Sequence, residues 1–169
     1  MNDAQMNDTI NIMRIIRGTT VDGPGFRTSI YFAGCYHKCE GCHNPDSWDF
    51  HAGEPMTLDQ IREVIEEEDF DVTLSGGDPL YNPEWVLAIS EIVHELNHSV
   101  WIYTGFRWEE ICSDEKLLNA VSHCDVIVDS PFMIHLRDTD LLFRGSSNQR
   151  IIDIKKSLDS GEIVLWSRD

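Results

Sequence analysis

Three of the five cysteines lie close together, as Cys35, Cys39 and Cys42 in the motif C-x-x-x-C-x-x-C. Soft sulfur ligands at such short spacing favour zinc or an iron–sulfur cluster. A structural zinc site needs four ligands, and His37 or His43 could supply the fourth. A four-iron cubane held entirely by the protein would also need four thiolates. Three thiolates leave one iron without a protein ligand, and an open coordination position is where metal sites engage substrates. The motif therefore predicts a metal site that binds a further molecule.

The remaining cysteines, Cys112 and Cys124, stand alone, seventy and more residues downstream of the motif. They do not form the second pair of ligands that a zinc finger normally has. In a helical or pre-strand context a cysteine usually behaves as a small buried hydrophobic residue, so no chemistry is assigned to them. A zinc-binding or ferredoxin-like module without catalysis stays open as an alternative of a different class.

The cysteine motif lies in a segment without periodicity, from 34 to 55, which follows two short runs of β-branched and aromatic residues. These runs, 10–16 and 28–33, predict two strands separated by the turn-forming sequence V-D-G-P-G-F-R. A stretch of about twenty residues without regular structure inside a compact domain is typical of a functional loop. We therefore expect a loop that holds the cysteines directly after the second strand.

The rest of the chain alternates between helical and strand patterns. Helices are expected to begin at Thr57, with the capping box T-L-D-Q, and at Pro83 behind Asn82, and helical material is expected within 107–123. The expected strands are 71–75, 100–104 and 126–128, whereas 141–166 is less regular. This alternation is typical of a parallel sheet, whose ligands lie at the carboxyl ends of the strands. The residues that fall there are Gly34, Gly76, Gly77, Thr104, Gly105 and Asp129.

The length of 169 residues fits one domain, predicted to span 10–169 after a flexible N-terminal segment, 1–9. The chain is shorter than the roughly 250 residues of a complete eight-stranded (β/α) barrel. A formal net charge of −17 repels phosphate backbones and anionic lipids, so neither nucleic-acid binding nor membrane binding is expected. Because the sequence has no long apolar run and no secretion signal, it predicts a cytoplasmic location.

Four motifs occur in a specific order. They are V-D-G-P-G-F-R at 21–27, G-C-Y-H-K-C-E-G-C-H-N-P at 34–45 with Trp48, L-S-G-G-D-P-L at 74–80, and R-G-S-S-N-Q at 144–149. The cysteine loop resembles that of the radical S-adenosylmethionine enzymes. The whole set, over about 12–152, resembles the activating enzymes of anaerobic, class III ribonucleoside-triphosphate reductases. The resemblance implies an α/β fold of the radical S-adenosylmethionine type, an open partial (β/α) barrel with a mostly parallel sheet in a single domain.

The resemblance also implies a reaction. In this family a reduced 4Fe-4S cluster passes one electron to the sulfonium of S-adenosylmethionine, which splits into methionine and a 5'-deoxyadenosyl radical. That radical takes hydrogen from a glycine of the reductase large subunit and leaves a glycyl radical there. The chain would then be an oxidoreductase, with flavodoxin or ferredoxin as its electron donor and with the reductase closing its open side. An activating enzyme for another glycyl-radical enzyme, such as pyruvate formate-lyase, is the alternative within the same chemistry.

Residue roles follow from the same resemblance. Cys35, Cys39 and Cys42 are the implied catalytic residues, which hold the cluster, while S-adenosylmethionine chelates the iron without a protein ligand. Gly76 and Gly77 match the motif whose backbone oxygens bond the amino group of the cofactor, and a strand-ending turn is the alternative. The remaining implied cofactor-binding residues are Gly41, Cys42, His43, Asp78, Thr104, Asp129 and Asn148.

Several of these assignments have specific alternatives. His43 offers a flat face for adenine, because Gly41 stands where the superfamily often has an aromatic residue. Thr104, Asp129, Ser146 and Asn148 are candidates for contacts with the ribose or the methionine carboxylate, and each has a capping or turn role as its alternative. Arg27 is expected to meet an anion or a partner carboxylate, or else to form a structural ion pair.

Overall fold

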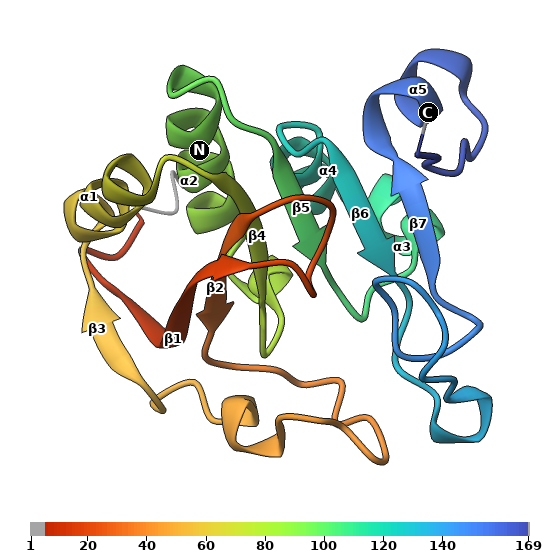
Figure 1. The fold of residues 1–169 in the computed structure, drawn as a ribbon. Coiled ribbons are helices and arrows are strands. Elements are labelled where there is room, and N and C mark those ends of the chain that lie inside the picture. Colours follow the sequence, from red (N-terminus) through yellow and green to blue (C-terminus); the bar gives the residue numbers. More distant parts are fainter. Residues whose placement is uncertain (1–5, 169) are drawn as a thin grey trace.

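The structure, a computed structural model, describes residues 6–168 and contains one seven-stranded sheet within them (Figure 1). Its strands are β1 (Ile10–Thr19), β2 (Arg27–Phe32), β3 (Glu54–Met56), β4 (Asp71–Gly76), β5 (Val100–Tyr103), β6 (Val126–Asp129) and β7 (Arg150–Asp153). The helices are α1 (Leu58–Glu68), α2 (Pro83–Glu95), α3 (Trp108–Cys112), α4 (Glu115–Val121) and α5 (Ile154–Ser160), with short 3₁₀ turns η1 (Pro45–Trp48), η2 (Pro79–Tyr81) and η3 (Ile134–Leu136).

The sheet has the order β3-β1-β2-β4-β5-β6-β7 and does not close, because β3 and β7 form its two edges. Its four central strands, β2, β4, β5 and β6, run parallel. Antiparallel pairs lie on both sides of them, β1 with β2 and β3 on one side and β7 with β6 on the other. The prediction of an open α/β sheet that is mostly parallel is thereby confirmed.

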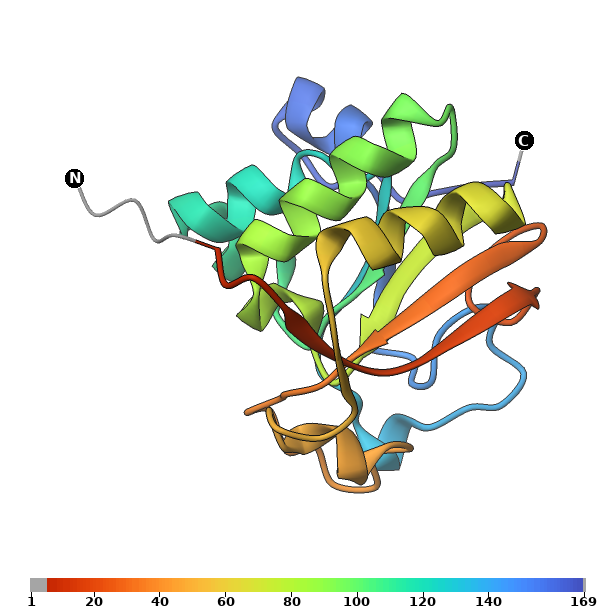
Figure 2. The ribbon, with the colours of Figure 1, turned by 90° about the vertical axis from the view of Figure 1, so that its left-hand side faces the viewer.

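Helices α1, α2 and α4 lie together on one face of the sheet (Figure 2). Each buries an apolar stripe, which in α1 consists of Ile61, Val64 and Ile65. These side chains join the strand residues Ile30, Leu74 and their neighbours in one hydrophobic core. Burial of this apolar surface is the main force that holds the layers together.

The expected helix starts at Thr57 and Asn82 are confirmed as the residues that precede α1 and α2. Thr57 forms the complete capping box with Gln60, whereas the side chain of Asn82 makes no capping hydrogen bond. The stretch expected to be helical within 107–123 is two helices, α3 and α4, because the carboxylate of Asp114 accepts hydrogen bonds from the first backbone amides of α4 and starts a new helix.

Two parts of the chain contain more regular structure than expected. The segment 141–166, expected to be less regular, contains β7 and α5, and the loop 34–55 contains η1 and ends in β3. Of the predicted flexible segment 1–9, residues 1–5 lie outside the described part of the chain. Residues 6–9 form no helix or strand. Among the described residues, no helix is both long and apolar enough to span a bilayer.

The carboxyl ends of the parallel strands point to one end of the molecule. The cysteine loop, which follows β2, and the segment 130–149, which follows β6, lie at this same end in both views (Figures 1 and 2). The topology therefore brings together segments about a hundred residues apart, as expected for ligand sites of parallel sheets.

Candidate functional site

The cysteine loop is folded back on itself by backbone hydrogen bonds. The amide of Gly34 donates to the carbonyl of Ser47 at 2.7 Å, and the amide of Cys35 donates to the carbonyl of Trp48 at 3.2 Å. The Ser47 hydroxyl is buried and donates to the carbonyl of Asn44 at 2.6 Å. The turn η1 thus closes the loop between 34–35 and 47–48. Cys35 lies at the first of these anchored ends, and Cys39 and Cys42 lie between them.

The three thiols differ in exposure. Cys35 is buried, whereas Cys39 and Cys42 are half-buried. Burial raises the pKa of Cys35 to about 11 and also raises the pKa of Cys39. Metal ligation requires thiolates, so these thiols need a bound cation to offset the cost of charge in this setting. The amide of Asn44 lies 3.5 Å from Cys42 Sγ, and such contacts stabilise charge on a ligating sulfur.

All three cysteines line one cavity of about 640 Å³. Four more of the predicted residues, His43, Gly76, Gly77 and Thr104, line it as well. The rest of the wall includes residues without a predicted site role, among them Arg14, Tyr31, Tyr103, Ser130, Phe132 and Phe143. It also includes Asp22, Arg144 and Gln149 from the sequence motifs, and His37, a candidate fourth zinc ligand. The cavity therefore joins the cysteine loop to the carboxyl ends of β4, β5 and β6.

The donor set is compatible with a cluster. Within residues 6–168, no group of three or more His, Cys, Asp and Glu side chains is arranged to hold one metal ion. In a cubane each cysteine binds its own iron, so the sulfur atoms surround a volume and do not converge on one point. Three thiols that line one wall of a cavity are compatible with such a cluster.

An aromatic pair lies beside the cysteines in the cavity. His43, directly after Cys42, contacts Phe132 with ring centroids 5.3 Å apart. Gly41 does not line the cavity, and a Cβ there would come within 2.3 Å of Ile134 Cδ1. The sequence signal for Phe132 was its place just after Asp129, at the end of a predicted strand. Two aromatic rings from distant segments, tilted by 51° to each other, thus border the cavity.

Gly76 and Gly77 lie where β4 ends against the cysteine loop. Gly76 has φ of +108°, and a Cβ there would come within 2.3 Å of the Phe32 amide nitrogen. The amide of Gly77 donates to the carbonyl of Phe32 at 2.7 Å. The close backbone approach that requires glycine here is an approach to the protein itself, while both residues also face the cavity.

Asp78 is fully buried beside the cavity and does not line it. Its Oδ2 accepts hydrogen bonds from His37 Nε2 at 2.7 Å, from Thr104 Oγ1 at 2.9 Å and from the Gly105 amide at 2.9 Å. Its Oδ1 accepts from the Leu80 amide at 3.0 Å and so caps η2. The carboxylate thus joins the cysteine loop to the ends of β4 and β5.

Asp129 is also fully buried and does not line the cavity. Its carboxylate accepts from the Trp108 amide at 2.8 Å, at the start of α3, and forms an ion pair with Arg150. Arg150 in turn binds the exposed carboxylate of Glu109. The structure therefore gives Asp129 the capping and pairing role that was the alternative for it.

The motif R-G-S-S-N-Q forms a tight turn directly before β7. Asn148 Nδ2 donates to the Pro131 carbonyl at 2.8 Å, while its Oδ1 is buried without a hydrogen-bond partner within 6–168. Ser146 is buried, and its hydroxyl accepts from the Met133 amide at 3.2 Å. The Oδ1 atom of Asn148 therefore retains capacity to accept a hydrogen bond.

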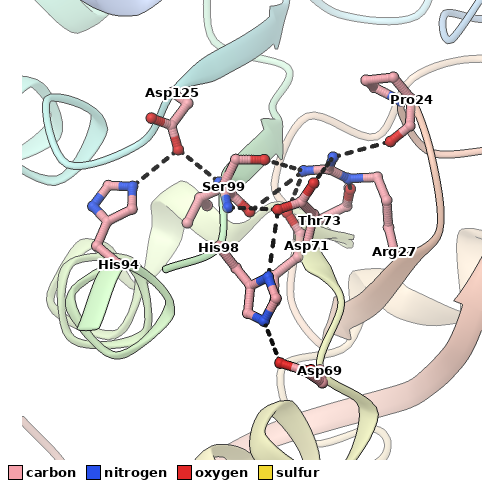
Figure 3. Close-up of polar contacts among 11 residues, drawn as sticks. Pro24, Arg27, Asp69, Asp71, Thr73, His94, His98, Ser99 and Asp125 are labelled. Atoms are coloured by element: carbon pink, nitrogen blue, oxygen red, sulfur yellow. Dashed lines mark hydrogen bonds and ion pairs between the residues drawn. The ribbon is translucent and has the colours of Figure 1, made fainter. Parts of the chain in front are cut away.

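Arg27 has a structural role, which was the alternative for it. It lies at the opposite ends of the strands, only 1% exposed, and its side chain donates to Thr73 Oγ1 at 2.8 Å and to the Val72 carbonyl at 2.9 Å (Figure 3). Its Nη1 lies 3.6 Å from a carboxylate oxygen of Asp71. Burial lowers the pKa of Arg27, and these contacts compensate for the loss of water around its charge.

Two arginines in the cavity wall had no predicted role, although Arg144 begins the motif R-G-S-S-N-Q. The guanidinium of Arg14 lies 4.8 Å from the ring centroid of Tyr31, and Arg144 donates to the Gln149 carbonyl at 2.7 Å. Neither has a carboxylate within ion-pair distance in the described part of the chain. In a protein of net charge −17, the cavity is thus a place where positive charge is left without a carboxylate partner.

The chain is similar to a described domain family and to named proteins. A family model described as "4Fe-4S single cluster domain" matches residues 21–152. The chain is 35% identical over 151 residues to the anaerobic ribonucleoside-triphosphate reductase-activating protein of Enterobacteria phage T4, an overlap of 84% of this chain and 93% of that protein. It is 34% identical over 139 residues to the protein of the same name from Salmonella typhi and 33% over 140 residues to that of Escherichia coli (strain K12). Each of these two overlaps covers 76% of this chain and 89% of the relative.

Proposed function

The chain belongs to the family of anaerobic ribonucleoside-triphosphate reductase-activating proteins, and we propose that it activates such a reductase as a radical S-adenosylmethionine enzyme. One observation supports this most directly. The three cysteines of the C-x-x-x-C-x-x-C motif line the same cavity as the glycines at the end of β4. When bound, the cluster and S-adenosylmethionine would supply the reductive cleavage that ends in a glycyl radical on the reductase.

Cys35, Cys39 and Cys42 are proposed to hold the cluster. The anchors of the loop at Ser47 and Trp48 fix the backbone around the first cysteine, and Cys42 has an amide hydrogen close to its sulfur. Because the chain supplies three thiolates, one iron would be left for the amino and carboxylate groups of the cofactor. Its electron donor is proposed to be a flavodoxin or a ferredoxin.

The cavity wall supplies groups suited to S-adenosylmethionine. The rings of His43 and Phe132 would contact adenine, and the backbone of Gly76 and Gly77 would bind the amino group. Thr104 faces the cavity and is proposed to bind the cofactor there. These contacts would orient the cofactor against the cluster and exclude water from its reactive bond.

Four further residues were predicted to bind the cofactor, and their surroundings suggest different contributions. Asn148 has a free acceptor atom in Oδ1 and stays a proposed ligand. Gly41 would contribute only backbone atoms, beside Ile134. Asp78 and Asp129 have their carboxylates in hydrogen bonds with the protein, so they are proposed to act by shaping the cavity wall.

The test is direct observation of the product radical. The protein is reconstituted anaerobically with iron and sulfide, reduced, and mixed with S-adenosylmethionine and an anaerobic ribonucleoside-triphosphate reductase. Electron paramagnetic resonance should then show the doublet of a glycyl radical on the reductase. One methionine should appear for each glycyl radical formed. A reaction without S-adenosylmethionine is the control.

Other outcomes would identify the alternatives. A radical formed on pyruvate formate-lyase but not on the reductase would indicate an activating enzyme with a different partner. One zinc per chain and no cleavage of S-adenosylmethionine would indicate a non-catalytic metal module and end the enzyme proposal.

A further inference from the structure

We propose that Asp78 is a positioning residue, whose buried carboxylate holds the first half of the cysteine loop in place through His37. This inference deepens the proposed function and rests on it for the identity of the bound cluster. The carboxylate of Asp78 is 0% exposed, and every contact of its Oδ2 comes from the loop or from the end of β5. It therefore joins the loop to the sheet from the inside.

The hydrogen bonds of Asp78 decide against direct contact with a ligand. Oδ2 already accepts from the Thr104 hydroxyl and the Gly105 amide, so His37 Nε2 is assigned as a further donor to it. With three donors on Oδ2 and the Leu80 amide on Oδ1, the group is satisfied by the protein. A ligand could reach it only by displacing one of these bonds inside a buried site, which is costly.

His37 is positioned to transmit this restraint to the metal ligands, because it lies between Cys35 and Cys39 in the chain. Its ring contacts Phe106 edge-on at a centroid distance of 4.7 Å and Tyr81 at 5.4 Å. A Cβ on Gly105 would come within 2.5 Å of the ring, so glycine makes room for it. The ring is thus held by two aromatic side chains, a backbone segment and a carboxylate.

The backbone beside His37 has a conformation that needs such support. Lys38, the next residue, has φ of +48°, a region in which side chains other than glycine are strained. Such conformations persist where the surrounding structure determines them. The bond from His37 to Asp78 joins this turn to the sheet, so we expect its loss to let the segment from Cys35 to Cys39 relax.

The inference is tested first on the full chain without metal, which makes the result independent of cluster chemistry. In a Cys112→Ser background the exposed thiol is absent, and the rate at which a thiol reagent modifies Cys39 reports loop order. Both Asp78→Asn and His37→Ala should raise this rate several-fold. The double variant should raise it little further, because both changes act on the same contact.

A second measurement uses the reconstituted protein. Groups that hold metal ligands in place typically contribute about 10–100-fold to metal affinity. Asp78→Asn and His37→Ala should therefore lose iron to a chelator at least about tenfold faster than the parent. His37→Gln, which keeps a donor on a side chain of similar reach, should restore part of the retention. Since His37 is only partly buried, His37→Ala keeps the test available if Asp78→Asn does not fold.

The outcomes separate positioning from ligand contact. If Asp78→Asn weakens S-adenosylmethionine binding while Cys39 reactivity and iron retention stay as in the parent, the positioning role is wrong. If His37→Ala leaves both properties unchanged, the role is also wrong. If the thiol result holds but no four-iron cluster can be assembled, the positioning role stands and the proposed function fails.

Discussion

Arg150 donates hydrogen bonds from both terminal nitrogens to the carboxylate of Glu109, from Nη1 at 3.0 Å and from Nη2 at 2.9 Å. The same guanidinium pairs with the fully buried carboxylate of Asp129 at the end of β6. One cation therefore neutralises an exposed and a buried acid at once. This arrangement ties α3, β6 and β7 together next to the cavity.

Replacing Arg150 by methionine should lower the free energy of unfolding by about 3 kcal/mol, because it leaves the buried Asp129 carboxylate without its cation. Urea unfolding of the metal-free chain measures this change. Glu109→Gln is the matched control, since it breaks only the exposed pair and should cost about 1 kcal/mol or less. Equal losses in the two variants would contradict the buried pairing of Asp129.

The pair between Glu109 and Arg150 also predicts a dependence on pH. Hydrogen bonds from Arg150 lower the pKa of Glu109 from 4.5 to about 2. A lowered pKa means that the folded state favours the ionised form of Glu109. The stabilisation of the fold by this carboxylate is therefore complete above pH 4.5 and is lost as pH falls toward 2. The difference in unfolding free energy between the parent and Glu109→Gln, at most about 1 kcal/mol for so exposed a pair, should shrink over this range. A difference that stays constant down to pH 3 would show that this pair is not its source.

Single replacement of Cys35, Cys39 or Cys42 by serine should abolish the glycyl radical and reduce iron well below about four atoms per chain, because each thiolate binds its own iron. Iron analysis after anaerobic reconstitution and electron paramagnetic resonance measure the two effects. Cys112→Ser is the control and should behave like the parent, since Cys112 does not line the cavity. A serine variant with full iron content and full radical yield would remove that residue from the ligand set.

Exposure to air should destroy the cluster, and S-adenosylmethionine should slow the loss. In the proposed three-thiolate cluster one iron would lack a protein ligand and be open to solvent and oxygen, whereas S-adenosylmethionine would cover it. The decay of visible absorbance in air, with and without S-adenosylmethionine, measures this protection. A cluster that survives prolonged aeration without the cofactor would contradict the open-iron arrangement.

The sequence predicted the parts of the fold that depend on local signals. The capping box at Thr57 and the apolar stripe after it located α1, and β-branched runs located the four parallel strands. Strand β3 was missed because it has only three residues and contains Pro55, and such edge strands carry little pattern. Helix α5 was missed because its sequence, I-K-K-S-L-D-S, offers few apolar positions, although Asp153 caps it.

The site was predictable where its residues form contiguous motifs and not where it depends on distant pairs. The cysteines and the two glycines were found from spacing and sequence. The bond between His37 and Asp78 joins residues 41 positions apart, and no local pattern signals it. Phe132 likewise reaches His43 only through the fold of the segment after β6.

The strand order has a consequence for the growing polypeptide. Strands β4, β5, β6 and β7 are each added on the same side of the sheet, in the order in which the chain is made. The cysteine loop therefore leaves the ribosome with the first strands, while the segment 130–149 that forms the facing wall emerges among the last. During synthesis the three thiols therefore emerge before the wall that faces them.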